Sequence, residues 1–143
     1  MKYTVIIDKD REEEIKIFAH EKTKLIDEIE RLVLSSSVEI IGYSNEVVKK
    51  LIPIEIYCFN IENGKVVAHT DTESFLVKQR IYELEEILDK NFIKINQSCI
   101  INIKKVLQFS ASFGGALMVT LKNGYKDYVS RRQLKLVKER VGI

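Results

Sequence analysis

Two short polar segments in the C-terminal part of the sequence carry residue types that can bind nucleic acid. Ser130-Arg131-Arg132-Gln133 follows a strand-like run and opens a helical pattern, in which Ser130 can cap the helix. The N–H groups of a helix start can bind a phosphate, and an arginine can donate two hydrogen bonds to guanine O6 and N7. Asn96-Gln97-Ser98 lies between two apolar runs and is expected to form a polar turn beside a strand framework. A capped helix with solvated arginines and an ordinary polar turn would explain the same residues.

The part of the chain that contains both segments is strongly basic. Residues 90–143 contain 11 Lys and Arg but only Asp127 and Glu139 as acids, so their formal charge is +9. Residues 1–89 contain 12 Lys and Arg and 19 Asp and Glu, a formal charge of −7, and the whole chain carries +2. A polyanion would be attracted to the basic part. The two parts could instead complement each other across an internal interface, but the charge and the polar segments together favour nucleic acid.

Other chemistry has little support in the sequence. His20 and His69 lie far apart without a metal-ligand spacing. Cys58 and Cys99 lie in strand-like runs, as expected of reduced, buried thiols. Gly114-Gly115 lacks the Gly-Lys-Ser/Thr of a P-loop and is interpreted as a hairpin tip. We therefore expect no enzyme activity, no catalytic residues, no cofactor and no metal site.

The length and composition predict one globular domain with at most a small appendage. The chain has 143 residues, of which 45% are hydrophobic and 31% are charged. No apolar run approaches the roughly 20 residues of a membrane span, and the N-terminus has no signal-peptide pattern. These features predict a cytoplasmic protein.

Residues 1–37 are predicted to form a small β-β-α unit. Tyr3, Val5 and Ile7 alternate with polar residues, and a second alternating run at 14–18 follows a charged turn. A helix is expected over 23–34, where five apolar residues follow helical spacing, and Ser35-Ser36-Ser37 is expected to end it and to act as a linker.

Residues 38–143 are predicted to consist mainly of strands. Asn63-Gly64 and Asn123-Gly124 predict hairpin turns, the former of type I′ with positive φ at both residues. One helix is expected over 79–88, and a closing helical turn is expected around 134–141. Strands are expected at 38–43, 47–52, 54–61, 66–70, 75–77, 92–95, 99–103, 106–109, 116–121 and 125–129.

Four segments of this second part closely resemble the LytTR DNA-binding domain family in order and spacing. They are YELEEIL (82–88), FIKINQSCIIN (92–102), VTLKNG (119–124) and YVSRR (128–132). The resemblance covers about residues 38–143, whereas 1–34 resembles the short extension of stand-alone LytTR proteins and not a receiver domain. It implies a mainly β, α+β fold built as an elongated stack of small antiparallel sheets, and a transcription factor that reads double-stranded DNA with loops.

The resemblance also implies where DNA is contacted. The loop between Asn60 and Lys65 and the segment 130–135 would enter successive major grooves, and Asn96-Gln97-Ser98 would lie over the minor groove between them. Arg132 is the expected base reader. The implied contact set is Lys65, Asn96, Gln97, Ser98, Tyr128, Ser130, Arg131, Arg132, Gln133 and Lys135, of which Lys65, Ser98, Tyr128, Gln133 and Lys135 would mainly hold phosphates.

The expected assembly is a homodimer on two repeated half-sites, with residues 1–37 as a possible dimerisation unit and 38–143 as the DNA-binding domain. The family resemblance implies a small membrane protein as a restraining partner, and no small-molecule substrate is expected. One alternative is a protein-interaction module whose basic face docks an acidic partner or a membrane surface. RNA binding is a third possibility.

Overall fold

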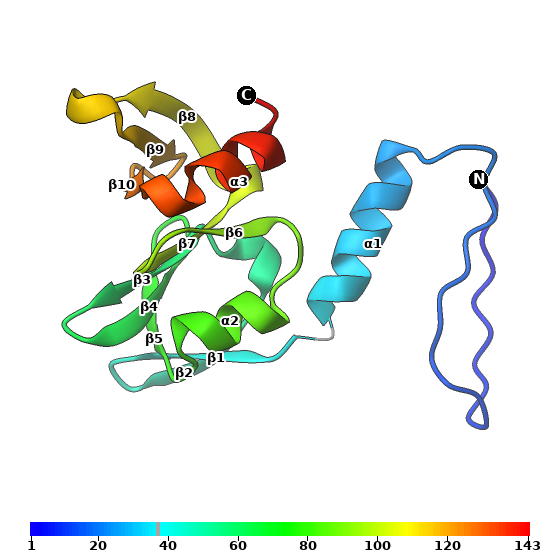
Figure 1. Ribbon diagram of the computed structural model, residues 1–143. Coiled ribbons are helices and arrows are strands. Elements are labelled where there is room, and N and C mark those ends of the chain that lie inside the picture. Colours follow the sequence, from blue (N-terminus) through cyan, green and yellow to red (C-terminus); the bar gives the residue numbers. More distant parts are fainter. Residues whose placement is uncertain (37) are drawn as a thin grey trace.

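The computed structural model describes residues 1–36 and 38–143 and has a mainly β architecture with few helices (Figure 1). This α+β class confirms the expectation from the sequence. The described helices are α1 (Lys24–Ser36), α2 (Ile81–Ile87) and α3 (Arg131–Val141). The described strands are β1 (Ile40–Ser44), β2 (Val47–Leu51), β3 (Cys58–Glu62), β4 (Lys65–His69), β5 (Ser74–Val77), β6 (Phe92–Asn96), β7 (Cys99–Asn102), β8 (Val106–Ala111), β9 (Leu117–Leu121) and β10 (Lys126–Val129).

The strands form two antiparallel sheets. The large sheet has seven strands in the order β2-β1-β5-β4-β3-β7-β6, and the small sheet has three in the order β10-β9-β8. In Figure 1, α3 lies between the small sheet and β6, which is an edge strand of the large sheet. The start of α3 is therefore held by both sheets.

The buried side chains form two hydrophobic cores. The first core lies between the large sheet and α2, where Ile81 and Leu84 pack with Phe59 and Phe92. The second core joins the small sheet to β6 and β7 and is closed by Val137 of α3, which is fully buried. Both clusters of buried residues come from the chain after Ser37. Residues 38–143 thus contain the apolar burial that a domain needs to fold.

Gly42 lies where two strands approach the backbone of β1 closely. A Cβ atom at this position would lie 2.7 Å from the Cβ of Phe75 and 2.9 Å from each terminal methyl of Leu51. Both side chains are buried, so they cannot move aside into solvent. Glycine is therefore required here by space, not by backbone conformation.

The two predicted Asn-Gly turns have different backbone conformations. Asn63 and Gly64 both have positive φ, at 51° and 75°, which confirms the type I′ hairpin between β3 and β4. At Asn123-Gly124, which joins β9 to β10, only Gly124 has positive φ. Gly114 and Gly115 form the turn between β8 and β9, as expected.

The N-terminal segment is only partly as predicted. The α1 helix continues through Ser35 and Ser36, two residues past its expected end, and Ser37 lies outside the described residues. The two strands expected in residues 1–18 are not formed; this segment runs as two extended stretches side by side, with exposed side chains (blue in Figure 1). Tyr3, Ile7 and Phe18 are 89%, 85% and 93% exposed. Only the second stretch approaches α1, where Ile17 is half-buried. An isolated pair of extended segments is at best marginally stable as a hairpin.

Candidate nucleic-acid interface

An open groove of about 940 Å³ lies between the β3–β4 turn, the connection from β5 to α2, and β6. Four cationic side chains line it, and its described lining contains no Asp or Glu. Lys78 places its Nζ 5.0 Å from the centre of the Tyr43 ring, and this cation–π contact favours one position of the ammonium group. We call this surface the basic groove; its cations are Lys65, Lys78, Arg80 and Lys94, and its polar and aromatic lining includes Tyr43, Gln79, Tyr82 and Gln97.

Two of the predicted contact segments meet at this groove. The type I′ turn leads directly into Lys65 at the start of β4, and the β6–β7 turn presents Gln97 and Ser98, both exposed. The two turns are joined because the backbone N–H of Ile61 donates to the carbonyl oxygen of Ser98 at 3.0 Å. Segments more than 30 residues apart in the sequence thus form one edge of the groove.

The third predicted segment, the start of α3, is bonded to β6, the strand that leads into the β6–β7 turn. The backbone N–H of Ser130 donates to the carbonyl oxygen of Ile95 in β6 at 2.8 Å, and Val137 anchors the helix in the second core. Arg131, Arg132 and Lys135 are exposed, and Gln133 is half-buried. Ser130 occupies the N-cap position, but its hydroxyl makes no capping hydrogen bond, contrary to expectation.

Lys94 makes the surface continuous between the groove and α3. Its side chain lines the basic groove and also a smaller hollow of about 280 Å³ that contains Gln133 and Arg140. This hollow also contains Glu85 and Asp89, so its charge is mixed. The β3–β4 turn, the β6–β7 turn and the start of α3 lie at the left of Figure 1. The predicted contact segments therefore share one side of the molecule.

Asn96 differs from the other predicted contact residues. Its side chain is 3% exposed; Nδ2 donates to Asp127 Oδ1 at 3.1 Å and to the Tyr128 carbonyl oxygen at 2.9 Å. Its Oδ1 accepts from the backbone N–H of Ser98 at 2.9 Å. The amide that was expected to face DNA is therefore used inside the protein. An Asn that bonds the N–H two residues ahead is the usual Asx-turn, so its place before a turn was the available signal.

A chain of hydrogen-bonded polar side chains connects the two sheets. It runs through His69, Asn60, Tyr125, Asp127 and Asn96, and we call it the junction network. Burial lowers the pKa of His69, although the Glu62 carboxylate at 3.3 Å opposes this effect. Burial also raises the pKa of Tyr125, so its hydroxyl stays protonated and can donate to Asp127 at 2.9 Å.

The two cysteines are free and buried, as expected. The neighbouring Cys58 thiol and burial raise the pKa of Cys99, which keeps this sulfur in its unreactive thiol form.

The sequence did not reveal Lys78 and Arg80 as members of the surface. Both belong to the acidic part of the chain, so their contribution is hidden in its formal charge of −7. They reach Lys94 only because the long-range pairing of β3 with β7 brings β6 into the large sheet.

Comparison with known proteins gives a consistent result. The family model described as the LytTr DNA-binding domain matches residues 47–142. An uncharacterized HTH-type transcriptional regulator of Staphylococcus aureus strain NCTC 8325 is 31% identical over 125 residues, which cover 84% of this chain and 85% of the relative. Its counterpart in strain MSSA476 is 32% identical with the same coverage.

A solved structure has the same fold. The LytTr DNA-binding domain of a Bacillus cereus protein superimposes with a TM-score of 0.69 at 15% sequence identity, over 73% of this chain and 97% of that domain. Among the described helices, none combines the length and apolar character needed to cross a bilayer.

Proposed function

The chain belongs to the LytTr DNA-binding domain family, and from this premise we propose that it is a transcriptional regulator that binds double-stranded DNA sequence-specifically in the cytoplasm. The observation that carries the proposal is the continuous surface from the basic groove through Lys94 to the start of α3. The four cations of the basic groove suit the phosphate backbone, which supplies most non-specific affinity.

The proposed readout uses turns and a helix start. Within the described residues, α2 and α3 are separated by five strands, so they do not form a helix-turn-helix pair. The β3–β4 turn and the start of α3 would enter successive major grooves, with the β6–β7 turn over the minor groove between them. Arg132, exposed in the first turn of α3, is the proposed base reader.

Five residues are proposed mainly to hold phosphates, which set the register on DNA: Lys65, Ser98, Tyr128, Gln133 and Lys135. Asn96 is proposed to shape the β6–β7 turn without contacting DNA, because its amide is already bonded internally. The proposed contacts are Lys65, Gln97, Ser98, Tyr128, Ser130, Arg131, Arg132, Gln133 and Lys135, to which Lys78, Arg80 and Lys94 are added from the groove.

Selection from a random duplex library, followed by a salt titration on the enriched duplex, tests this function. A sequence-specific regulator should enrich a defined motif and bind it at least a thousandfold more tightly than random duplex. The logarithm of the binding constant should fall linearly with the logarithm of salt concentration. Failure to enrich any motif, with equal affinity for all duplexes, would contradict the proposal.

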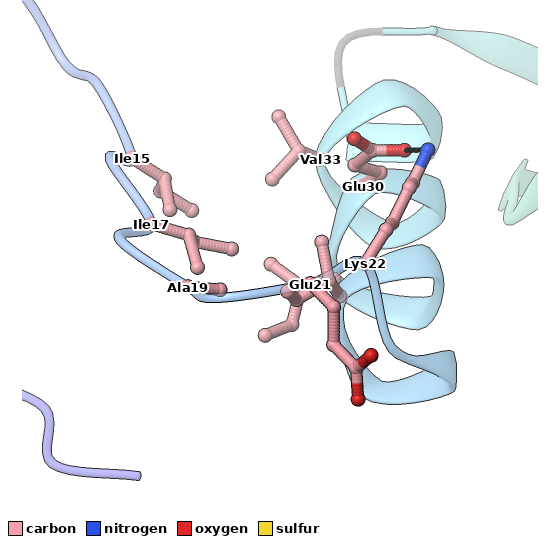
Figure 2. A pocket seen from close by; sticks show the side chains of 9 residues that line it. Ile15, Ile17, Ala19, Glu21, Lys22, Glu30 and Val33 are labelled. Carbon is pink, nitrogen blue, oxygen red and sulfur yellow. Dashed lines mark ion pairs between the residues drawn. The ribbon is translucent and has the colours of Figure 1, made fainter.

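We also propose that residues 1–37 form an extension that links two copies into a homodimer on repeated half-sites. Figure 2 shows Ile15 and Ile17 of the extended segment facing Val33 of α1 across a hollow of about 700 Å³. The exposed apolar side chains Tyr3, Val5, Ile6, Ile7, Phe18, Leu25 and Leu32 lie on the same segment. A second copy could add strands to the extended stretches and bury both sets of apolar residues.

Removal of residues 1–37 tests the dimer. Both cores lie after Ser37, so the remaining chain should fold as a monomer that binds one half-site normally. It should lose the extra affinity for two half-sites, because the second contact is intramolecular only in a linked dimer. Mass in solution and affinity for one-site and two-site duplexes are the measurements. A persistent dimer or an unfolded product would contradict the proposal.

The family resemblance further supports a small membrane protein as the restraining partner. Co-purification of the tagged chain with membranes of its own host, and its release when that partner is deleted, would test this association. A soluble distribution that does not depend on any membrane protein would contradict it.

A further inference from the structure

The junction network ties together all three proposed DNA-contact segments. His69 on β4 bonds Asn60 on β3 (Nε2 to Oδ1, 2.7 Å), and Asn60 Nδ2 lies 3.2 Å from both the Tyr125 hydroxyl and Glu62 Oε1. Glu62 is next to the β3–β4 turn. The network thus begins at the first contact segment, on the large sheet.

The other end of the network holds the second and third segments. Asp127 on β10 accepts three hydrogen bonds, from the Tyr125 hydroxyl at 2.9 Å, from Asn96 Nδ2 at 3.1 Å and from the backbone N–H of Tyr128 at 2.8 Å. Asn96 then bonds the backbone of Ser98 in the β6–β7 turn and of Tyr128 just before α3. Two backbone atoms of contact segments are therefore fixed by one side chain.

Each member of the network has a partner for its polar atoms when His69 is neutral. The Nε2–H tautomer donates to Asn60, and Nδ1 accepts from the Ser74 hydroxyl at 2.9 Å. The rings of His69 and Tyr125 are stacked, with centroids 5.6 Å apart and 28° between their planes. A part-buried network whose hydrogen bonds are all made favours one arrangement over nearby ones, because any shift leaves a polar group unpaired.

From these contacts we propose that the junction network determines DNA specificity without touching DNA, by fixing the distance between the β3–β4 turn and the start of α3. This inference rests on the proposed function, since it needs two segments that read one duplex. Base contacts require placement within about 0.5 Å, whereas long lysine and arginine side chains reach phosphates from many positions. Asn60, Tyr125 and Asp127 are thus positioning residues.

Tyr125→Phe is the direct test, because it removes the hydroxyl at the centre of the network and keeps the ring that packs on the second core. The probes are the duplex enriched by the wild-type protein and a random duplex of equal length. We expect the ratio of the two affinities to fall about tenfold, while affinity for random duplex and the slope of the salt dependence stay unchanged. Tyr57→Phe is the matched control, since Tyr57 packs on the same core outside the network, and its ratio should stay at the wild-type value.

Asp127→Asn is the second variant, which removes the acceptor charge at the other end of the tyrosine hydrogen bond and should lower the same ratio. A purely structural role would lower affinity for both duplexes equally, together with the melting temperature, and would overturn the proposal. An unchanged ratio in either folded variant would also overturn it. If the wild-type protein itself shows no preference between the duplexes, the proposed function has failed and not this inference alone.

Discussion

The side-chain amide of Asn96 lies 2.9 Å from the carbonyl oxygen of Tyr128, so the end of β6 is bonded directly to the strand that leads into α3. The same amide group holds the β6–β7 turn through Ser98. One buried polar side chain therefore sets the conformation of two surface segments that are 30 residues apart. Such a residue affects binding through the shape of the protein, which leads to the first prediction.

Asn96→Ala should destabilise the fold and also lower the preference for the enriched duplex over random duplex, because Asn96 belongs to the junction network. It leaves Asp127 Oδ1 and the Tyr128 carbonyl oxygen without the donor they share, a loss of about 1–3 kcal/mol in the free energy of unfolding. Urea unfolding measures this loss. Gln97→Ala is the matched control: its side chain is exposed at the turn, so its unfolding free energy should stay within about 0.5 kcal/mol of the wild type. Equal losses of unfolding free energy in the two variants would contradict the assigned role of Asn96.

Arg132→Ala should relax specificity at one base position. An arginine that donates two hydrogen bonds to guanine contributes about 1–3 kcal/mol of discrimination. The Arg132 side chain is exposed, so its removal should disturb the fold little. Binding to the enriched duplex and to its single-base variants is the measurement. If the variant loses affinity equally on every duplex, Arg132 holds a phosphate and does not read a base.

Lys78→Ala should weaken binding to all duplexes alike and lower the slope of the salt dependence by about one unit. Lys78 belongs to the acidic part of the sequence, and only its position in the basic groove predicts this effect. Lys135→Ala, on the exposed face of α3, should behave in the same way. Lys9→Ala, in the exposed N-terminal segment, is the control and should leave the slope unchanged. An unchanged slope for Lys78→Ala would remove the basic groove from the interface.

Local features of the fold could be predicted from the sequence because local chemistry determines them. The type I′ turn at Asn63-Gly64 follows from positive φ at both residues, and the strands from alternating and β-branched runs. The prediction of two N-terminal strands was wrong, because alternation of apolar and polar residues predicts a strand only where a partner covers its apolar face. In the described chain, Tyr3 and Ile7 have no such cover.

The site was predictable only as separate segments. The basic C-terminal part and the Ser130-Arg131-Arg132 motif were visible in the sequence, but their placement beside Lys78 and Arg80 depends on the strand order of the large sheet. The role of Asn96 also depends on a partner 31 residues away, Asp127. Long-range pairing of this kind leaves no local pattern in one sequence.

Gly42→Ala should destabilise the protein by about 1–3 kcal/mol, which is typical of overpacking a buried site. The new methyl group would overlap Phe75 and Leu51, which lie 2.7 Å and 2.9 Å from its position. Thermal unfolding is the measurement. Gly124→Ala is a useful contrast, because a Cβ there meets open space but a φ of 90° strains the backbone instead. Relief of the Gly42→Ala defect by Leu51→Ala, which makes space, would identify steric overlap as the cause; no relief would contradict it.

His69 should make the stability of the fold depend on pH in a defined direction. Burial disfavours the charged imidazolium and lowers the pKa of His69 below 6.5, despite the opposing Glu62 carboxylate. As the pH falls below about 6.5, the unfolded chain therefore binds a proton before the folded chain does, and stability decreases until the folded pKa is passed. The stabilising contribution of neutral His69 is fully present above pH 6.5.

His69→Gln should remove the part of the stability decrease between pH 7 and pH 5 that comes from His69, measured by urea unfolding at each pH. His20→Gln, in the exposed N-terminal segment, should retain that decrease. A His69→Gln profile parallel to that of the wild type would show that His69 keeps the same proton affinity in both states.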